Sequence, residues 1–119
     1  MLINLSNHPF AQWDKEQKDQ ANMLYGKTED MQFPAVAPYA DAEEIATLAH
    51  DYANKILTLS PAAVHIMGEN TFCFALISML QRAGVICIAS TTWRDSIETA
   101  EGKISRFRFV RFRKYPRIS

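Results

Sequence analysis

The sequence predicts an α/β protein, a Rossmann-like three-layer sandwich with four parallel strands and a C-terminal antiparallel hairpin. Short apolar runs alternate with segments of helical periodicity over residues 2–89. This repeated order calls for a right-handed parallel sheet with helices on both faces. The last part of the chain breaks the order, because two alternating runs flank Gly102 there as in a β-hairpin.

Four apolar runs are expected to form the parallel strands, with three helices between them. The strands are predicted over residues 2–5, 30–33, 63–67 and 85–89, and the helices over residues 14–25, 42–59 and 71–83. Capping boxes at Asp14 and Asp41 open the first two helices, and Gly84 ends the third.

The hairpin is expected to pair residues 96–99 with residues 103–113. In its second strand Phe107 and Phe109 alternate with arginines, but Val110 and Phe112 repeat this alternation one residue out of phase. Both phases cannot lie on one face of a regular strand, so we predict a β-bulge near Phe109 and Val110.

Composition is typical of one globular domain over residues 1–119. The 119 residues are 48% hydrophobic, yet no apolar run approaches the roughly 20 residues that span a bilayer. The N-terminus lacks the features of a signal peptide, and we expect the protein in the cytoplasm. Cys73 and Cys87 are expected to be core residues, and no spacing of His or Cys predicts a metal or cofactor.

The zero net charge hides an asymmetry along the chain. Residues 1–102 carry 13 acidic and 6 basic side chains, or −7, whereas residues 103–119 carry no acid and 7 bases, or +7. The basic segment could contact phosphate or an acidic partner, or it could neutralise its own domain.

The loops that follow parallel strands emerge at one edge of the sheet, where α/β proteins bind ligands. One of them, the turn after the third strand, opens directly into a helix whose first N–H groups can hold an anion. Hydroxyls, amides, one imidazole and one guanidinium would meet at this edge and suit a nucleotide-like ligand. The candidate residues are Ser6, Asn7, His8, Gly68, Glu69, Asn70, Thr71, Ser90, Thr91, Thr92 and Arg94.

Each candidate also has a structural interpretation. Ser6 and Asn7 are common turn formers, and Glu69 could cap backbone instead of meeting a ligand. His65 is interpreted as an ordinary strand residue. The Phe/Arg alternation of residues 106–113 could stack bases, but Phe in the core and Arg in water is the more common arrangement. Motifs of phosphate-loop enzymes, dinucleotide-binding enzymes and serine hydrolases are absent from the sequence.

The segments at residues 2–9, 67–72 and 90–94 resemble those of small proteins related to the CRISPR-associated Rossmann fold, the CARF-like group. In that group a polar turn after strand one, a Gly-Glu turn after strand three and a Ser/Thr-Thr turn with a basic residue after strand four frame a site for cyclic oligoadenylates. The resemblance implies a homodimer and, for a chain without an effector domain, a ring nuclease of antiviral defence that cleaves this messenger.

The resemblance also suggests a metal-independent mechanism. A ribose 2′-hydroxyl held in line with the next phosphate needs positioning and charge stabilisation only. His8 would act as acid or base, and Arg94 with the N–H groups at residues 69–71 would hold phosphate oxygens. The alternatives are a nucleotide sensor without turnover and a non-catalytic interaction module. The module would use Arg106, Arg108, Arg111 and Arg113 to bind RNA or an acidic partner.

Overall fold

The computed structural model describes residues 1–118 and contains one mixed five-stranded sheet. The strands are β1 (Leu2–Ser6), β2 (Thr28–Asp30), β3 (Ala63–Met67), β4 (Cys87–Thr99) and β5 (Gly102–Lys114). They lie in the order β2-β1-β3-β4-β5. The first four run parallel to one another, and β5 runs antiparallel to β4, so the predicted combination of parallel strands and a hairpin is confirmed.

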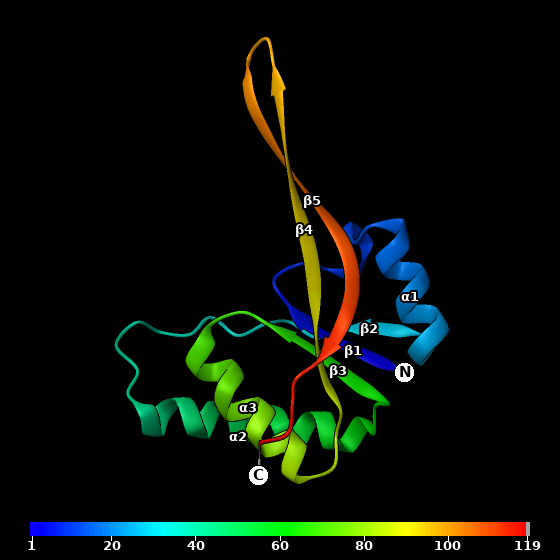
Figure 1. Cartoon of the computed structure of the whole chain (residues 1–119). Coiled ribbons are helices and arrows are strands. Elements are labelled where there is room, and N and C mark those ends of the chain that lie inside the picture. Colours follow the sequence, from blue (N-terminus) through cyan, green and yellow to red (C-terminus); the bar gives the residue numbers. More distant parts are fainter. Residues whose placement is uncertain (119) are drawn as a thin grey trace.

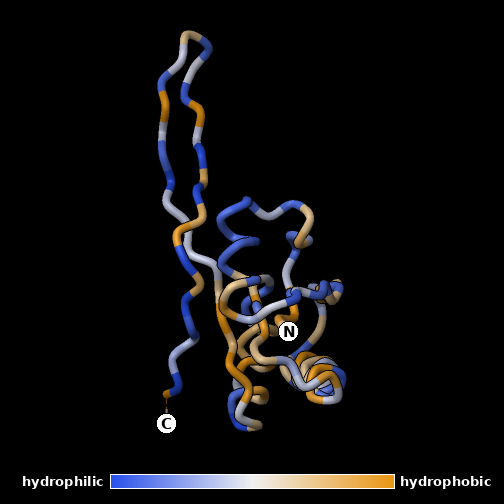
Figure 2. Tube along the Cα trace, turned by 90° about the vertical axis from the view of Figure 1, so that its right-hand side faces the viewer, coloured by the Kyte–Doolittle hydropathy of each residue, from blue (hydrophilic) through white to orange (hydrophobic). Residues whose placement is uncertain are grey.

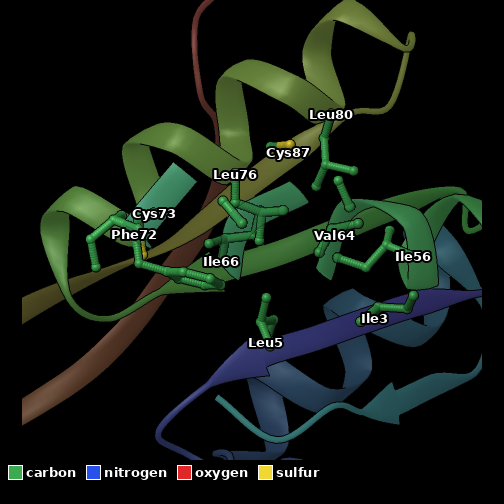
Figure 3. Close-up of a cluster of buried hydrophobic side chains, with 13 residues drawn as sticks. Ile3, Leu5, Ile56, Val64, Ile66, Phe72, Cys73, Leu76, Leu80 and Cys87 are labelled. Atoms are coloured by element: carbon green, nitrogen blue, oxygen red, sulfur yellow. The ribbon is translucent and has the colours of Figure 1, made fainter. Parts of the chain in front are cut away.

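Helices cover the sheet on both faces (Figure 1). Alternate residues of β1 separate the two cores, because successive side chains of a strand point to opposite faces. Ile3 and Leu5 pack with α2 (Ala42–Leu59) and α3 (Asn70–Arg82), and Figure 3 shows this larger core. Leu2 packs on the other face with Trp13 and with α1 (Lys15–Tyr25).

The helices follow the sequence closely. The bounds of α2 agree with the predicted range, and Asp41 accepts a hydrogen bond of 2.9 Å from the N–H of Glu44, as an N-cap residue should. The predicted cap at Asp14 is wrong in its detail, because that side chain makes no bond to the first turn of α1. Its carboxylate instead lies 3.4 Å from the N–H of Phe109 in β5.

Two strands differ from the prediction. Strand β2 lies at residues 28–30 instead of 30–33, and the chain continues from it as an irregular segment to α2. Strand β4 does not stop at residue 89 but continues to Thr99. The predicted turn at residues 90–94 is therefore part of a strand, and β4 itself forms the first half of the hairpin. Threonine and tryptophan favour extended backbone, and pairing with β5 satisfies their backbone groups.

The predicted bulge is confirmed at Val110. Thr91 pairs with Arg111 whereas Thr92 pairs with Phe109, so Val110 has no partner on β4. The extra residue brings Phe109 and Phe112 to the same face, and both are buried in the core on the α1 side. Beyond the bulge the hairpin leaves the body of the protein and projects as a long twisted arm (Figures 1 and 2).

Candidate functional site

A buried polar network lies at the centre of the sheet, between two neighbouring strands. Asn4 of β1 pairs with His65 of β3, and their side chains are only 1% and 2% exposed. Strand β1 lies between β2 and β3 in the sheet. The chain therefore moves in one direction along the sheet from β1 to β2 and in the opposite direction to reach β3. The two residues therefore lie where the strand order reverses, the usual place for a ligand in an α/β sheet.

The hydrogen bonds of Asn4 define where the protons of this network lie. Its amide nitrogen donates to the carbonyl of His8 and to the carboxylate of Asp30, both at 2.9 Å. Its amide oxygen must then act as acceptor, both from the Ser6 hydroxyl at 2.8 Å and from Nδ1 of His65 at 2.9 Å. His65 therefore carries its proton on Nδ1.

The other ring nitrogen of His65 is consequently a hydrogen-bond acceptor. Nε2 lies 2.7 Å from the hydroxyl of Ser90 on β4, so the Ser90 hydroxyl donates to the imidazole. The same hydroxyl oxygen accepts a bond of 3.0 Å from the amide of Gln17 on α1. Ser90, His65 and Asn4 thus form a line of hydroxyl, base and orienting group, which is the arrangement that activates a hydroxyl in many enzymes.

His65 is neutral at physiological pH. Burial, with a smaller contribution from the nearby imidazole of His8, lowers the pKa of His65 to about 4. The edges of Trp13 and Phe112 face the His65 ring at centroid distances of 5.1 and 5.8 Å, which excludes water from that side. An uncharged imidazole whose Nε2 lone pair accepts the Ser90 hydrogen bond is therefore the resting state of the network.

The loop that follows β1 is held in place by the same network. The carbonyl of His8 accepts hydrogen bonds from Asn4 and, at 3.0 Å, from the indole N–H of Trp13. The His8 side chain itself is exposed. A pocket of about 390 Å³ opens beside this loop, lined by Asn4, Ser6, Asn7, Pro9, Asp30, Met31, Gln32 and Phe33.

The turn after β3 has a structural role that accounts for two of its residues. The carboxylate of Glu69 accepts bonds of 2.9 Å from the N–H groups of Thr71 and Phe72 and also bonds the Thr71 hydroxyl. These bonds lower the pKa of Glu69. Glu69 is thus the N-cap of α3, and the N–H groups expected to hold a phosphate at residue 71 already have a partner.

Gly68 and Asn70 lie on the other side of that turn. A side chain at residue 68 would collide with the ring of Phe33, so close packing explains this glycine. Both residues line a second, mainly apolar hollow of about 770 Å³ between α3 and the C-terminal tail. The hollow also includes Met67, Cys73, Phe74, Ile77, Ser78, Gln81, Tyr115, Pro116 and Ile118.

Strand β4 separates the remaining predicted residues along its length. Ser90 reaches the buried network, whereas Thr91 bonds the carbonyl of Arg111 across the hairpin, and Thr92 is exposed. Arg94 lies on the projecting arm, where its guanidinium donates to the Ser105 hydroxyl at 3.1 Å and lies over the Phe107 ring, 5.8 Å from its centroid. Four residues of strand separate Arg94 from Ser90, or about 13 Å.

Sequence reasoning thus found Ser6, His8 and Ser90 but overlooked the two residues that connect them. Asn4 and His65 each interrupt an otherwise apolar strand. A polar side chain in such a strand is costly to bury without a partner, and two of them on adjacent strands would have been a usable signal.

Among residues 1–118, no cluster of three or more His, Cys, Asp or Glu side chains could hold a metal ion, and no helix is long and apolar enough to cross a membrane.

Comparison with known proteins identifies the family of this chain. No curated protein and no solved structure matches the sequence. A family model matches residues 1–113, and the chain therefore belongs to the Uncharacterized protein MJ1673 family.

Proposed function

We propose that this protein binds a nucleotide at the carboxyl edge of its Rossmann-like sheet and cleaves it without a metal ion. The substrate suggested by the CARF-like resemblance is a cyclic oligoadenylate, which would make the protein a ring nuclease of CRISPR antiviral defence. The observation that carries the proposal is the bond of 2.7 Å between the Ser90 hydroxyl and the unprotonated Nε2 of His65 at the β1/β3 switch point.

The network suggests where the proton of the attacking hydroxyl would go. A ribose 2′-hydroxyl beside Ser90 would give its proton to the Ser90 oxygen while Ser90 passes its own proton to His65 Nε2. The 2′-oxygen would form a bond to the adjacent phosphorus, and the bond from phosphorus to the 5′-oxygen would break. The exposed imidazole of His8 could protonate that leaving oxygen, giving a 2′,3′-cyclic phosphate and a 5′-hydroxyl.

This proposal moves the role of base from His8 to His65. His65 is oriented by Asn4 and paired with a hydroxyl, whereas the described contacts of His8 involve its backbone. The negative charge of a bound phosphate would favour the protonated form of His65 and so counteract the burial that lowers its pKa. Ser6 and Asn7, which line the pocket beside the loop, would orient the ribose or adenine.

The test is incubation of the purified protein with cyclic tri-, tetra- and hexa-adenylate in EDTA, followed by chromatography of the products and by thermal melting. We expect cleavage of one ring size, and a loss of about 10²-fold or more in Ser90→Ala and His65→Gln. His50→Gln is the matched control, because His50 is exposed on α2. Folding of each variant is checked by circular dichroism.

Three outcomes are distinguishable. Cleavage that Ser90→Ala retains in full would refute the role of the network. Stabilisation of the protein without product would indicate a nucleotide sensor. Neither cleavage nor stabilisation, with folded protein, would refute the cyclic oligoadenylate proposal.

A second candidate function, an interaction module, is favoured by one observation. The basic strand β5 forms one side of an arm that stands away from the body (Figure 2). The arginines of β5 are exposed. If this strand bound RNA, charge reversal at Arg106 and Arg111 would weaken binding, and affinity would fall steeply with salt.

A further inference from the structure

The bulge at Val110 places the arginines of β5 on one face of the hairpin. Two of them lie at even positions of the sequence and two at odd positions, so a regular strand would point the two pairs to opposite faces. The extra residue brings the pairs back into phase. The resulting surface, which we call the arginine face, consists of Arg106, Arg108, Arg111 and Arg113 with their β4 partners Asp95, Trp93, Thr91 and Ala89.

The guanidinium groups of this face are available to a ligand. All four arginines are exposed. Within residues 1–118 they form a single ion pair, in which Arg108 lies 3.9 Å from the carboxylate of Asp95. Residues 1–91 carry 10 acids and 5 bases, or −5, but none of those acids pairs with the four arginines. With four arginines and one aspartate, the arginine face keeps a charge of +3.

The spacing of the four arginines is regular. Side chains on one face of a strand recur every two residues, or about 7 Å. The bulge keeps this interval between Arg108 and Arg111, because a single ladder position, Thr92 with Phe109, lies between them. A line of cations at equal intervals suits a polyanion whose charges also repeat at equal intervals, and the phosphate backbone of a nucleic acid is such a polymer.

One aromatic side chain lies among these arginines. Trp93 is the cross-strand partner of Arg108 and is 66% exposed. The phenylalanines of β5 are not available on this face, because Phe109 and Phe112 are buried and Phe107 lies on the opposite face. An exposed indole can stack on an unpaired base, whereas the bases of a duplex already stack on one another. The arrangement therefore favours a single strand.

We propose that the arginine face binds single-stranded nucleic acid, with the arginines on successive phosphates and Trp93 stacked on a base. Ile97 and Ile104 lie on the same face nearer the tip of the arm, 41% and 51% exposed, and extend the surface for bases and sugars. The inference rests on the second candidate function, the interaction module, and assigns it a type of strand and a stacking residue. It uses none of the side chains in the Ser90–His65–Asn4 network.

The test is fluorescence anisotropy of a labelled oligoadenylate of about 12 nucleotides, titrated with the full chain. Between about 50 and 200 mM salt, log affinity should fall against log salt with a slope of about −3, since each phosphate contact of a single strand contributes about −0.7. Arg106→Gln should reduce this slope by about 0.7. Lys103→Gln is the matched control, because Lys103 is exposed on the opposite face of the same strand. Asp95→Asn should strengthen binding, since it removes the one acid that pairs with an arginine.

The role of Trp93 has a separate readout. Trp93→Ala should weaken binding roughly 5- to 100-fold, and Trp93→Phe, which keeps an aromatic ring, should lose less. Binding should also quench the tryptophan fluorescence of the unmodified protein, because Trp93 is exposed and the second tryptophan, Trp13, is buried. Trp93→Phe should abolish this quenching. All substituted side chains are exposed or half-buried on the hairpin, so circular dichroism should be unchanged.

The outcomes separate this proposal from its neighbours. No binding of oligoadenylate or oligouridylate by the folded protein at the lowest salt would overturn it. Equal affinity for a duplex, with Trp93→Ala unaffected, would also overturn it but would leave the interaction module intact. Equal binding of polyglutamate, again without dependence on Trp93, would indicate an acidic protein partner instead. The arm variants should cleave cyclic oligoadenylate like the unmodified protein, so failure of the proposed nuclease is measured independently.

Discussion

The Nε2 atom of His65 lies 2.7 Å from the hydroxyl of Ser90, and the proton between them belongs to Ser90. This assignment follows from Asn4, whose amide nitrogen has two acceptors and whose oxygen must therefore receive the Nδ1 proton of His65. One buried asparagine thus sets the tautomer of the histidine, and the histidine in turn orients the serine.

The buried imidazole predicts a loss of stability in mild acid. The pKa of His65 is about 4 in the folded state and about 6.5 in the unfolded state, so the unfolded chain gains a proton first as pH falls. The free energy of unfolding should fall by about 3 kcal/mol between pH 6.5 and pH 4 from this group alone. Denaturant titrations across this range should show a smaller decrease for His65→Gln than for the unmodified protein. His50→Gln should retain the full decrease, and equal slopes for all three proteins would contradict the assignment.

The cap of α3 predicts different effects of two substitutions at residue 69. Glu69→Ala leaves the N–H groups of Thr71 and Phe72 without their partner and should lower the melting temperature by a few degrees. Glu69→Asp keeps a carboxylate that can cap the helix and should lose less. The carboxylate of Glu69 has a lowered pKa and is protonated only in strong acid. The difference in melting temperature between Glu69→Ala and the unmodified protein should therefore disappear there. Thermal melting of the three proteins at neutral and acidic pH measures this.

The contact between Gly68 and Phe33 predicts a coupled pair of substitutions. Gly68→Ala should cost about 1–3 kcal/mol, because the new Cβ overlaps the Phe33 ring, which is itself held edge-on against Phe72. In the Phe33→Ala background that ring is absent, and Gly68→Ala should then cost much less. A double-mutant cycle of unfolding free energies gives the coupling. An additive result would show that residue 68 is restricted by something other than Phe33.

The bulge predicts that one deletion is tolerated and a longer one is not. Removing Val110 leaves Phe109 and Phe112 opposite Thr92 and Ser90, so both rings stay on the buried face. Removing Val110 and Arg111 together turns Phe112 to the other face and should cost about 3–5 kcal/mol, as the loss of a buried phenylalanine does. Chemical denaturation of the two deletion variants distinguishes them, and equal destabilisation would argue against the register.

The two cysteines predict slow alkylation of the native protein. Burial raises the pKa of Cys73 to about 11 and that of Cys87 to about 12, so little thiolate is present at pH 8. Iodoacetamide should label neither residue rapidly until guanidinium unfolds the chain, and mass spectrometry of the tryptic peptides follows both sites. Rapid labelling of native Cys87 would show that the face of β4 toward α3 opens in solution.

Periodicity and capping predicted α2 and β3 at their observed bounds, because these signals lie within a few residues of one another. The bulge at Val110 was equally visible, since Phe109 and Phe112 cannot otherwise share a face. The end of β4 was not, because residues 90–94 have the composition of a polar turn, and only pairing with β5 keeps them extended. The expectation that Arg94 and Ser90 lie in one site was wrong for the same reason, because an extended strand separates them.

The sequence by itself determined the order of strands and helices, their amphipathic faces and the hairpin, because side-chain spacing along the chain encodes each of these. Only the tertiary structure decided that Asn4, His65 and Ser90 meet. They come from three different strands, and a shift of one residue in the pairing of β1, β3 or β4 would point their side chains to opposite faces. Register is set by the packing of the whole sheet, and it is register that turns three separate polar residues into one network.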